Sequence, residues 1–298
     1  MRHQARDSRP LAAVTGGAGA LGSHLVHALC EAGWRVRCLE HRRKVPRADE
    51  IVQGDVLEPN ALERLLVGAD ACVHAAAVTH ARSSAAYRRT NVGGTRAVAA
   101  AAERAGVRRL VHLSTSALAP DGGAYSRSKL EAERALAGSR VVVTILRLPE
   151  VYAAGGREGI DGLIARARAG RPLFVVGRGV HEVRPVHVDD VVAVVPRTLV
   201  SERAAGQTYT LAGESLSLRA FAEACLLAFG SSSRIVPVPE PLVAAAAVLA
   251  RVLPLPLYPD QLARLRGSRP DPSPAAAPDL GFEPRPLGAG LAALAGLP

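Results

Sequence analysis

Short apolar runs alternate with stretches of helical spacing through the first half of the chain. A plausible helix separates each run from the next, which is the pattern of repeated β-α-β units. We therefore predict an α/β fold with a doubly wound, Rossmann-like parallel sheet. The six runs are "LAAVT" (11–15), "RVRCL" (35–39), "EIVQGDV" (50–56), "ACVHAAA" (71–77), "RLVHLST" (109–115) and "VVVTILR" (141–147).

The alternation breaks down after Pro149. Glycine-rich loops follow, with a helical stretch over 162–170 and strand-like segments over 172–177 and 207–213. This pattern predicts a dinucleotide-binding domain over 11–150 and a smaller, mainly substrate-binding lobe over 151–298. We expect a segment at about 183–200 to return to the sheet domain. The proline-rich connector "SRPDPSPAAAPDLGF" (268–282) is expected to lie over the surface.

Composition places the chain among globular proteins. Of its 298 residues, 48% are hydrophobic, which is ample for a core, whereas only 3% are aromatic, which disfavours the stacking platforms of single-strand nucleic-acid binders. The net charge of +10 comes from arginines spread along the chain, so an anionic substrate or a merely basic surface explains it equally well. Nucleic acid is therefore not expected as a partner.

The cysteines, the first ten residues and one apolar stretch indicate where in the cell the protein is expected. The four cysteines have no C-x-x-C spacing, and three lie in apolar segments, so we expect reduced and mostly buried thiols. The first ten residues lack an apolar core, which predicts a frayed end, no secretory signal and a cytoplasmic protein. The apolar stretch 241–257 is too short for a span and contains Arg251, Pro254 and Pro256, which favours a buried or surface-lying helix.

The stretch "AVTGGAGALGSHLVHAL" (13–29) places glycines between a strand-like run and a helical one. Because the amide groups at a helix start and its dipole attract anions, and because glycine lets a ligand approach the backbone, this turn predicts a site for the pyrophosphate of a dinucleotide. An ordinary glycine turn is the alternative. The glycines are Gly16, Gly17, Gly19 and Gly22.

Glu40 closes the second strand-like run, about 20 positions after the glycines, where a dinucleotide site has an acidic residue. A carboxylate there binds the ribose hydroxyls of NAD and repels the 2′-phosphate of NADP. Arg42 and Arg43 follow at once and could hold that phosphate, so NADP stays possible. Both arginines could equally lie in a solvated loop.

Tyr125 and Lys129 lie four positions apart, on one face of a predicted helix. An ammonium group beside a phenol stabilises the phenolate, so the pair could exchange a proton with a substrate hydroxyl or carbonyl. The alternative is an exposed helix in which Lys129 pairs with Glu133 and Tyr125 caps the start. The preceding run ends in "LSTSAL", and we expect its hydroxyls at the same sheet edge as the glycine turn.

These motifs together resemble the extended short-chain dehydrogenase/reductase superfamily, in its NAD-dependent epimerase/dehydratase family. The resemblance covers roughly residues 11–213, in the family's order. The matching pieces are "TGGAGALG" (15–22), "GDV" (54–56), "VHAAA" (73–77), "TNVGGT" (90–95), "LSTSA" (113–117), "YSRSK" (125–129), "LRLPEVY" (146–152) and "VHVDDV" (186–191).

The resemblance implies a set of site residues. It implies a catalytic hydroxyl at Thr115, with Ser114 as the fallback and Ser116 less favoured, acting with Tyr125 and Lys129. Lys129 is also implied to bind the nicotinamide ribose. The remaining cofactor contacts are implied for Gly16, Gly19, Ala20, Leu21 and Gly22 at the pyrophosphate, Glu40 at the ribose, Asp55 and Val56 at the adenine, Ala75, Ala76, Ala77 and Pro149 at the nicotinamide, and Asn91 at the active-site edge, where a helix cap is the alternative.

The sequence also departs from the family pattern. Only nine positions separate Ser116 from Tyr125, and Glu150 stands where many sugar-nucleotide enzymes carry asparagine, which weakens the case for a sugar-nucleotide substrate. Arg184 could meet a substrate phosphate or pair with Glu182 or Asp189. His187 and Asp189 are expected to hold the lobe to the sheet. The histidines show no metal-ligand spacing, so no metal is expected.

Two functional hypotheses follow. The first is an NAD(P)-dependent epimerase, dehydratase or dehydrogenase that moves hydride between nicotinamide and a hydroxyl or ketone carbon of a small molecule, such as a sugar nucleotide or a steroid-like alcohol. The second is a non-catalytic, dinucleotide-binding assembly protein, because the tail resembles relatives of the respiratory complex I accessory subunit. The intact Tyr125 and Lys129 favour the enzyme. Family habit further implies a homodimer.

Overall fold

A parallel sheet of seven strands forms the body of the protein in the computed structural model, which describes residues 8–156, 159–250 and 260–296. The order β3-β2-β1-β4-β5-β6-β11 confirms the doubly wound, Rossmann-like sheet, and each of the six predicted runs contains a strand. The strands are β1 (Leu11–Thr15), β2 (Arg35–Glu40), β3 (Glu50–Gln53), β4 (Ala71–His74), β5 (Arg109–Thr115), β6 (Val142–Leu148) and β11 (Thr208–Thr210).

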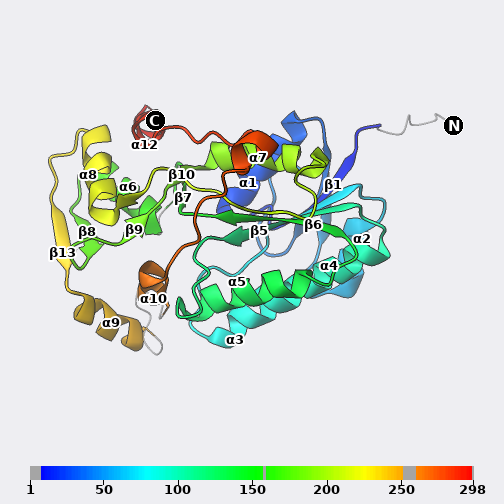
Figure 1. Cartoon of the computed structure of the whole chain (residues 1–298), viewed down its shortest axis with the longest axis horizontal. Coiled ribbons are helices and arrows are strands. Elements are labelled where there is room, and N and C mark those ends of the chain that lie inside the picture. The colour runs from blue at the N-terminus through cyan, green and yellow to red at the C-terminus, as the bar shows by residue number, and fades with distance from the viewer. Residues whose placement is uncertain (1–7, 157–158, 251–259, 297–298) are drawn as a thin grey trace.

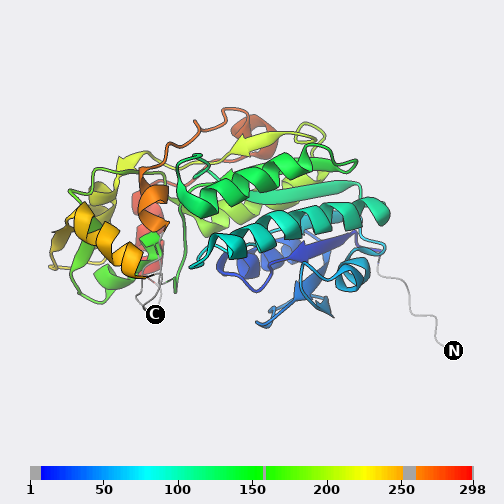
Figure 2. The same ribbon diagram turned by 90° about the horizontal axis from the view of Figure 1, so that it is seen from below.

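Helices cover both faces of this sheet. Helices α1 (Ala20–Glu31) and α7 (Val188–Val200) lie on one face, and α2 (Pro59–Leu66), α4 (Thr95–Arg104) and α5 (Gly123–Leu136) lie on the other (Figures 1 and 2). Alternate residues of β1 point into the two layers, since Val14 packs with Leu25 of α1 whereas Ala13 packs with Leu62 of α2. Burial on both faces explains why the strands read as continuous apolar runs.

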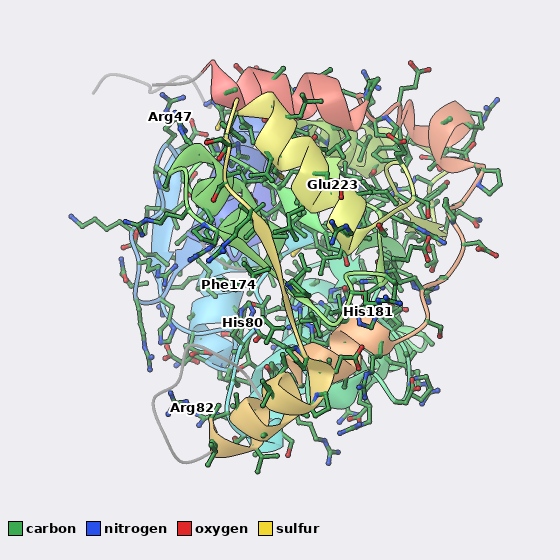
Figure 3. All side chains as sticks on the ribbon, turned by 90° about the vertical axis from the view of Figure 1, so that its left-hand side faces the viewer. Arg47, His80, Arg82, Phe174, His181 and Glu223 are labelled. Atoms are coloured by element: carbon green, nitrogen blue, oxygen red, sulfur yellow. The ribbon has the colours of Figure 1, made fainter. Side chains whose placement is uncertain are left out.

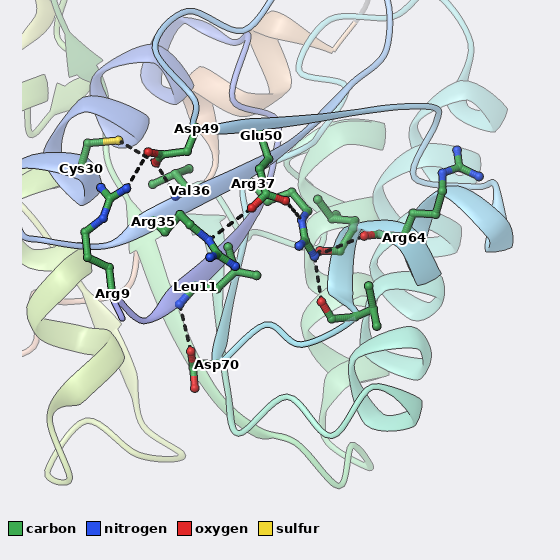
Figure 4. A network of polar contacts seen from close by, with 12 residues as sticks. Arg9, Leu11, Cys30, Arg35, Val36, Arg37, Asp49, Glu50, Arg64 and Asp70 are labelled. Carbon is green, nitrogen blue, oxygen red and sulfur yellow. Dashed lines mark hydrogen bonds and ion pairs between the residues drawn. The ribbon is translucent and has the colours of Figure 1, made fainter. Parts of the chain in front are cut away.

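The connection between β2 and β3 contradicts the expected helix between every pair of strands. Residues 41–49 are all described and form an irregular loop, because this polar stretch offers no apolar face to pack on the sheet. Side chains hold the edge strand instead. Arg37 Nε donates to Glu50 Oε2 at 2.6 Å, and Arg37 Nη1 donates to main-chain oxygens at the end of α2, including that of Val67 at 2.8 Å (Figure 4).

The lobe is built from three two-stranded sheets and several helices. Strand β7 (Val151–Tyr152) pairs with β10 (Val186–His187), β9 (Glu182–Val183) with β12 (Leu216–Ser217), and β8 (Leu173–Val176) with β13 (Ile235–Val238). Its apolar core includes Leu163, Phe221 and Leu291. The helices are α6 (Gly159–Arg168), α8 (Leu218–Ala228), α9 (Glu240–Leu249), α10 (Gln261–Arg266) and α12 (Leu287–Ala295).

More of the second half returns to the sheet domain than the sequence indicated. Helix α7 packs on α1, as expected for the segment at 183–200, and β11 adds a strand beside β6. The expectation that connector 268–282 lies over the surface is wrong for part of its end, because Ala276 and Leu280 of α11 (Ala276–Leu280) and Phe282 are buried in the core of the sheet domain. The exact division into domains stays a prediction.

Helix α9 lies on the surface of the lobe. Within it only Ala247 is buried, whereas Leu242 is 62% exposed and Val248 60%. Glu240 ties its start to the lobe, with Oε1 3.1 Å from His181 Nε2 (His181 is labelled in Figure 3). No helix in the described part of the chain is long and apolar enough to cross a membrane. The remainder of the apolar stretch, 251–257, and the expected frayed end at 1–7 lie outside the described residues.

The cysteines conform to the sequence prediction. All four lie in the described part of the chain and carry free thiols; Cys38, Cys72 and Cys225 are buried, and Cys30 is half-buried. Burial raises the pKa of each of the three buried thiols to about 12, so these side chains are protonated and unreactive at neutral pH.

Candidate active site at the carboxyl ends of the strands

Strand order reverses between β1 and β4, and ligands of doubly wound sheets bind in the crevice at this point. Thr15 and His74 end these two strands in register, and Thr15 Oγ1 lies 2.7 Å from His74 Nδ1. The other ring nitrogen, Nε2, lies 2.9 Å from Thr95 Oγ1 on α4. Burial lowers the pKa of His74 to about 3, so the ring is neutral and braces the crevice floor. Sequence reasoning missed this contact, although both residues lie in predicted strands.

The glycine turn occupies the crevice beside this floor, and two of its glycines are required by space. Gly16 has a φ of +81°, and a Cβ there would lie 2.5 Å from the main-chain nitrogen of Ala76. A Cβ on Gly22 would lie 2.0 Å from the main-chain oxygen of Gly16. The missing side chains therefore let α1 start directly above the turn and against the end of β4.

The start of α1 is suited to bind an anion. Among the described residues, no side chain caps this helix, and its first turn carries no acidic residue. The amides of Ala20, Leu21 and Gly22 belong to the first turn, where amides have no partner within the helix. The positive end of the helix dipole adds to these donors. This bare, glycine-walled helix start fits a dinucleotide pyrophosphate.

Glu40 ends β2 with its carboxylate held in place. Its Oε2 accepts a hydrogen bond from the amide of Val45 at 2.7 Å, and Oε1 accepts one from Gln53 Nε2 at 2.5 Å. The Val45 amide and then the Gln53 side chain lower the pKa of Glu40, so the carboxylate is ionised at neutral pH. Arg42 and Arg43 are both exposed, as the solvated-loop alternative predicts.

Asp55 and Val56, the implied adenine contacts, follow β3. Asp55 Oδ1 accepts a hydrogen bond from the amide of Leu57 at 2.9 Å, and Oδ2 lies 3.4 Å from His41 Nε2. Val56 is buried. One polar and one apolar side chain thus lie side by side after the strand.

Asn91 supports the loop that follows β4, which contains Ala75, Ala76 and Ala77. It lies inside a π-helix (Arg88–Gly94), so the helix-cap alternative is wrong. Its Oδ1 accepts from the amide of Val78 at 2.8 Å, and its Nδ2 donates to the oxygen of Val78 at 3.0 Å and to Ser128 Oγ at 2.9 Å. Asn91 therefore links this loop to α5, and a direct cofactor contact stays a prediction.

Tyr125 and Lys129 both lie on the buried face of α5, where they are 7% and 2% exposed. Lys129 Nζ donates to the oxygen of Leu113 at 2.8 Å and lies 3.4 Å from His112 Nε2. Burial lowers the pKa of Lys129 to about 8, with the charge of Glu133 opposing the shift, so the ammonium form still prevails at neutral pH.

The exposed-helix alternative for this pair is wrong. Glu133 is buried and binds Arg147 of β6, with Arg147 Nη2 2.6 Å from Oε2, and it also accepts a hydrogen bond from Ser114 Oγ. Tyr125 lies inside the first turns of α5, packed against neighbouring rings, and not at an exposed cap.

The hydroxyl groups after β5 differ in what they contact. Ser114 is buried and donates to Glu133 at 2.5 Å, and Ser116 is buried beyond the strand end. Thr115 is half-buried at the last position of β5, and its Oγ1 accepts from the amide of Ala117 at 3.2 Å, which leaves its own proton available to a ligand. These contacts favour Thr115 as the residue that binds a reacting oxygen, and its role stays a prediction.

The C-terminal region covers the ring of Tyr125, a contact that no spacing in the sequence indicated. The guanidinium carbon of Arg264 lies 4.0 Å from the ring centroid, and Tyr87 meets the same ring edge-on at 5.9 Å. Asp260, just before α10, accepts hydrogen bonds from the amide of Tyr125 at 3.3 Å and from the hydroxyl of Tyr87 at 3.1 Å. Figure 1 shows α10 beside the start of α5.

The arginines where lobe and sheet meet are paired with carboxylates. Arg184 Nε donates to Glu182 Oε1 at 2.8 Å, as one alternative predicted. The buried Arg269 binds Glu150 Oε1 through Nη2, directly after Pro149. Sequence reasoning did not identify Arg269, and neither guanidinium group is left as an unneutralised charge.

His187 and Asp189 lie at the junction of β10 and α7. The amide of Asp189 donates to His187 Nδ1 at 3.2 Å, and the His187 ring meets Tyr152 edge-on at 5.3 Å. Burial is the main cause that lowers the pKa of His187. This packing supports the structural role expected for the pair.

One hollow lies far from these residues. It has a volume of about 1000 Å³, opens at the amino ends of the strands, and is lined by residues that include Trp34 and Arg109. Arg109 is paired there with Glu202 at 2.5 Å. Within the described residues, no group of three histidine, cysteine or acidic side chains is placed to hold a metal ion.

Comparison with known proteins gives a family match and several similar reductases. The family described as "NAD dependent epimerase/dehydratase" matches residues 12–212. The chain is 37% identical over 196 residues to a ceramide reductase from Caulobacter vibrioides, which is 63% of this chain and only 61% of that relative's length. It is 31% identical over 268 residues to a 4-hydroxy-2-methyl-3-oxo-4-farnesyl-3,4-dihydroquinoline-1-oxide ketoreductase from Stigmatella aurantiaca, covering 80% of this chain and 79% of the relative.

A solved structure is also similar over nearly the whole chain. The dTDP-glucose 4,6-dehydratase DesIV from Streptomyces venezuelae, solved with NAD bound, matches with a TM-score of 0.76 and 25% identity. The match covers 96% of this chain and 95% of the dehydratase chain.

Proposed function

The chain belongs to the NAD-dependent epimerase/dehydratase family, and we propose that it is an oxidoreductase that reduces a ketone on a largely apolar small molecule. The observation that carries this proposal is the buried pair on α5: Tyr125 and Lys129 lie one helical turn apart on its buried face, and a main-chain oxygen of Leu113 holds the lysine ammonium group. Burying an ammonium group is unfavourable, so this arrangement is most readily explained by a chemical use.

NAD is the cofactor of this family, and the crevice fits it. When bound, its nicotinamide supplies or accepts the hydride. We assign the first turn of α1 to the pyrophosphate, Glu40 to the adenosine ribose, and Lys129 to the nicotinamide ribose. An ionised carboxylate at Glu40 favours NAD over NADP because it repels a 2′-phosphate.

The proton step is assigned to Tyr125. Its hydroxyl donates a proton to the substrate oxygen as the ketone becomes an alcohol, and the nearby Lys129 ammonium group stabilises the phenolate that remains. Thr115 holds the same substrate oxygen through its free hydroxyl proton. Tyr87 meets the ring of Tyr125 edge-on and limits its orientation.

The pairing of lobe arginines favours an apolar ketone over a sugar nucleotide. A nucleoside diphosphate needs unneutralised cations, yet Arg184 and Arg269 are each bound to a carboxylate. Two relatives are named as reductases of a ceramide and of a farnesyl-bearing ketone. Both names agree with a substrate that carries a long apolar group.

The non-catalytic assembly hypothesis is disfavoured by the same evidence. A protein that only binds a dinucleotide has no use for a lysine and a tyrosine that are both buried on one face of α5. Two relatives are named as reductases, and the matches cover 63% and 80% of this chain.

The proposal is tested by replacing the phenol. With reduced NAD and a panel of long-chain 3-oxo compounds, we expect Tyr125→Phe to lose turnover by about 10²–10⁴-fold, the typical contribution of a positioned general acid. Affinity for NAD, measured by calorimetry, should change little. Tyr209→Phe is the matched control. Tyr209 lies in β11, away from the crevice, and the substitution removes a phenol hydroxyl that donates a hydrogen bond to Asp279. Unchanged turnover in Tyr125→Phe would refute the assignment.

The reaction type and the oligomeric state can be tested in the purified protein. A dinucleotide that exchanges freely indicates a dehydrogenase. Tightly retained NAD indicates an epimerase or dehydratase, which returns the hydride to its substrate. The expected homodimer is tested by sedimentation at micromolar concentration.

A further inference from the structure

We propose that Arg264 is a specificity-determining residue that binds a carboxylate carried next to the reacting ketone, which makes a long-chain 3-oxo acid the preferred substrate class. This inference rests on the proposed ketone reduction. It concerns the one side chain of α10 that lies on the ring of Tyr125.

Arg264 differs from other arginines of the lobe and tail in its lack of a carboxylate partner among the described residues. Nearby arginines of the lobe and tail each lie within 4.0 Å of a carboxylate: Arg184 with Glu182, Arg266 with Glu240, Arg269 with Glu150, and Arg285 with Asp190. Among the described residues, Arg264 has no carboxylate within that distance. Within the part of the chain that the structure describes, its guanidinium group donates one hydrogen bond, from Nη1 to the oxygen of Thr79 at 2.9 Å.

The position of this cation suits a carboxylate near the reaction centre. The guanidinium carbon lies 4.0 Å from the centroid of the Tyr125 ring, whose hydroxyl is the proposed proton donor. A ketone bound to that hydroxyl brings its own substituents close to the guanidinium. In a 3-oxo acid, only one methylene group separates the ketone from the carboxylate. The remaining N–H groups of Arg264 can then form charge-assisted hydrogen bonds.

The guanidinium group is also held in position before a substrate binds. Asp260 begins the turn before α10 and accepts hydrogen bonds from the amide of Tyr125 and the hydroxyl of Tyr87. The amide of Arg264 donates to the oxygen of Asp260 at 3.0 Å. Both carboxylate oxygens of Asp260 are thus engaged by α5 and Tyr87, so Asp260 anchors α10 without neutralising Arg264.

The test compares an acid with its neutral ester. Reduced NAD and 3-oxododecanoate or methyl 3-oxododecanoate are supplied to the full chain. We expect the wild type to prefer the acid by at least 10-fold in kcat/KM. Arg264→Gln should lose that preference, mainly through a higher KM for the acid, while its kcat/KM for the ester changes less than 3-fold. Arg264→Lys should recover part of the preference, because it restores the charge.

Arg266→Gln is the matched control, since Arg266 lies two positions away on α10, is exposed and pairs with Glu240. It should leave both substrates unaffected. An equal loss on acid and ester in Arg264→Gln would overturn the inference, because Arg264 would then act only by positioning Tyr125. A wild type that reduces ketones without preferring the acid would overturn it as well.

Binding without turnover separates this inference from the proposed function. Calorimetry on the NAD-loaded protein with 3-hydroxydodecanoate should give at least a 10-fold weaker affinity in Arg264→Gln than in the wild type, with no such change for its methyl ester. If the wild type binds the acid in this way but reduces no ketone, the proposed reduction fails while the carboxylate site stands. Equal affinity for the acid in both proteins would reject the site.

Discussion

Lys129 and Leu113 are joined by a hydrogen bond of 2.8 Å, from the ammonium group on α5 to a main-chain oxygen of β5. The bond fixes the depth of the lysine beneath the crevice, and the neutral ring of His112 lies on its other side. Because burial lowers the pKa of Lys129 to about 8, its charge changes within an accessible pH range.

The affinity for NAD should therefore fall at alkaline pH. Below pH 8 the lysine is an ammonium group, and one of its N–H groups remains to bind the nicotinamide ribose. Above pH 8 the lysine loses a proton and its charge. We expect the dissociation constant of NAD to rise several-fold between pH 7 and pH 9.5, measured by calorimetry. Lys129→Met should bind weakly at both values, and the same pH dependence in that variant would contradict the assignment.

Gly22→Ala tests whether the glycine turn is required by close packing. Alanine usually favours a helix over glycine by about 1 kcal/mol, but here its Cβ would lie 2.0 Å from the oxygen of Gly16. Backbone atoms cannot move aside cheaply, so the free energy of unfolding should fall by about 1–3 kcal/mol in denaturant titrations, the typical effect of overpacking. NAD affinity should fall with it.

Gly138→Ala provides the control for that experiment. A Cβ there meets nothing within 4 Å, so its effect should stay within about 0.5 kcal/mol. A Gly22→Ala protein as stable as the control would show that the turn tolerates a side chain.

Glu133→Gln should destabilise the sheet domain. Its carboxylate is buried and binds Arg147, whose side chain is 26% exposed, and it also accepts from Ser114. Breaking a fully buried pair typically costs about 3–5 kcal/mol, and partial exposure of the arginine reduces this to about 2 kcal/mol. The control is Glu131→Gln on the same helix, whose pair with the exposed Arg88 contributes less than about 1 kcal/mol. Equal losses of unfolding free energy in the two variants would mean that the buried pair stabilises the protein no more than the exposed pair does.

Glu40→Ala should relax the preference for NAD over NADP. The ionised carboxylate repels a 2′-phosphate, and the exposed Arg42 and Arg43 remain to attract it once Glu40 is gone. We expect the ratio of the two dissociation constants to shift by about tenfold. Glu31→Ala, which removes an exposed carboxylate at the end of α1, should leave the ratio unchanged. No shift in Glu40→Ala would place the ribose elsewhere.

Local patterns in the chain predicted the strands and the position of the glycine turn. The apolar runs predicted the strands because a strand buried on both faces must be apolar at every position. The glycines, Glu40 and the spacing of Tyr125 and Lys129 could be identified in the sequence because each depends on a few neighbouring residues and on where a parallel strand ends; their roles stay predictions. Thr15 and His74 also lie in predicted strands, yet their contact depends on which strands are neighbours, and this was not predicted.

Only the tertiary structure decided what surrounds the reactive pair. Glu133, which the exposed-helix alternative paired with Lys129, binds Arg147 of β6, because α5 packs on the sheet. Arg264 reaches Tyr125 from 139 positions away, through a lobe that folds back over the sheet domain. Hydrophobic periodicity carries no information about such pairings, because they are set by how whole elements pack against one another and not by the preferences of adjacent residues.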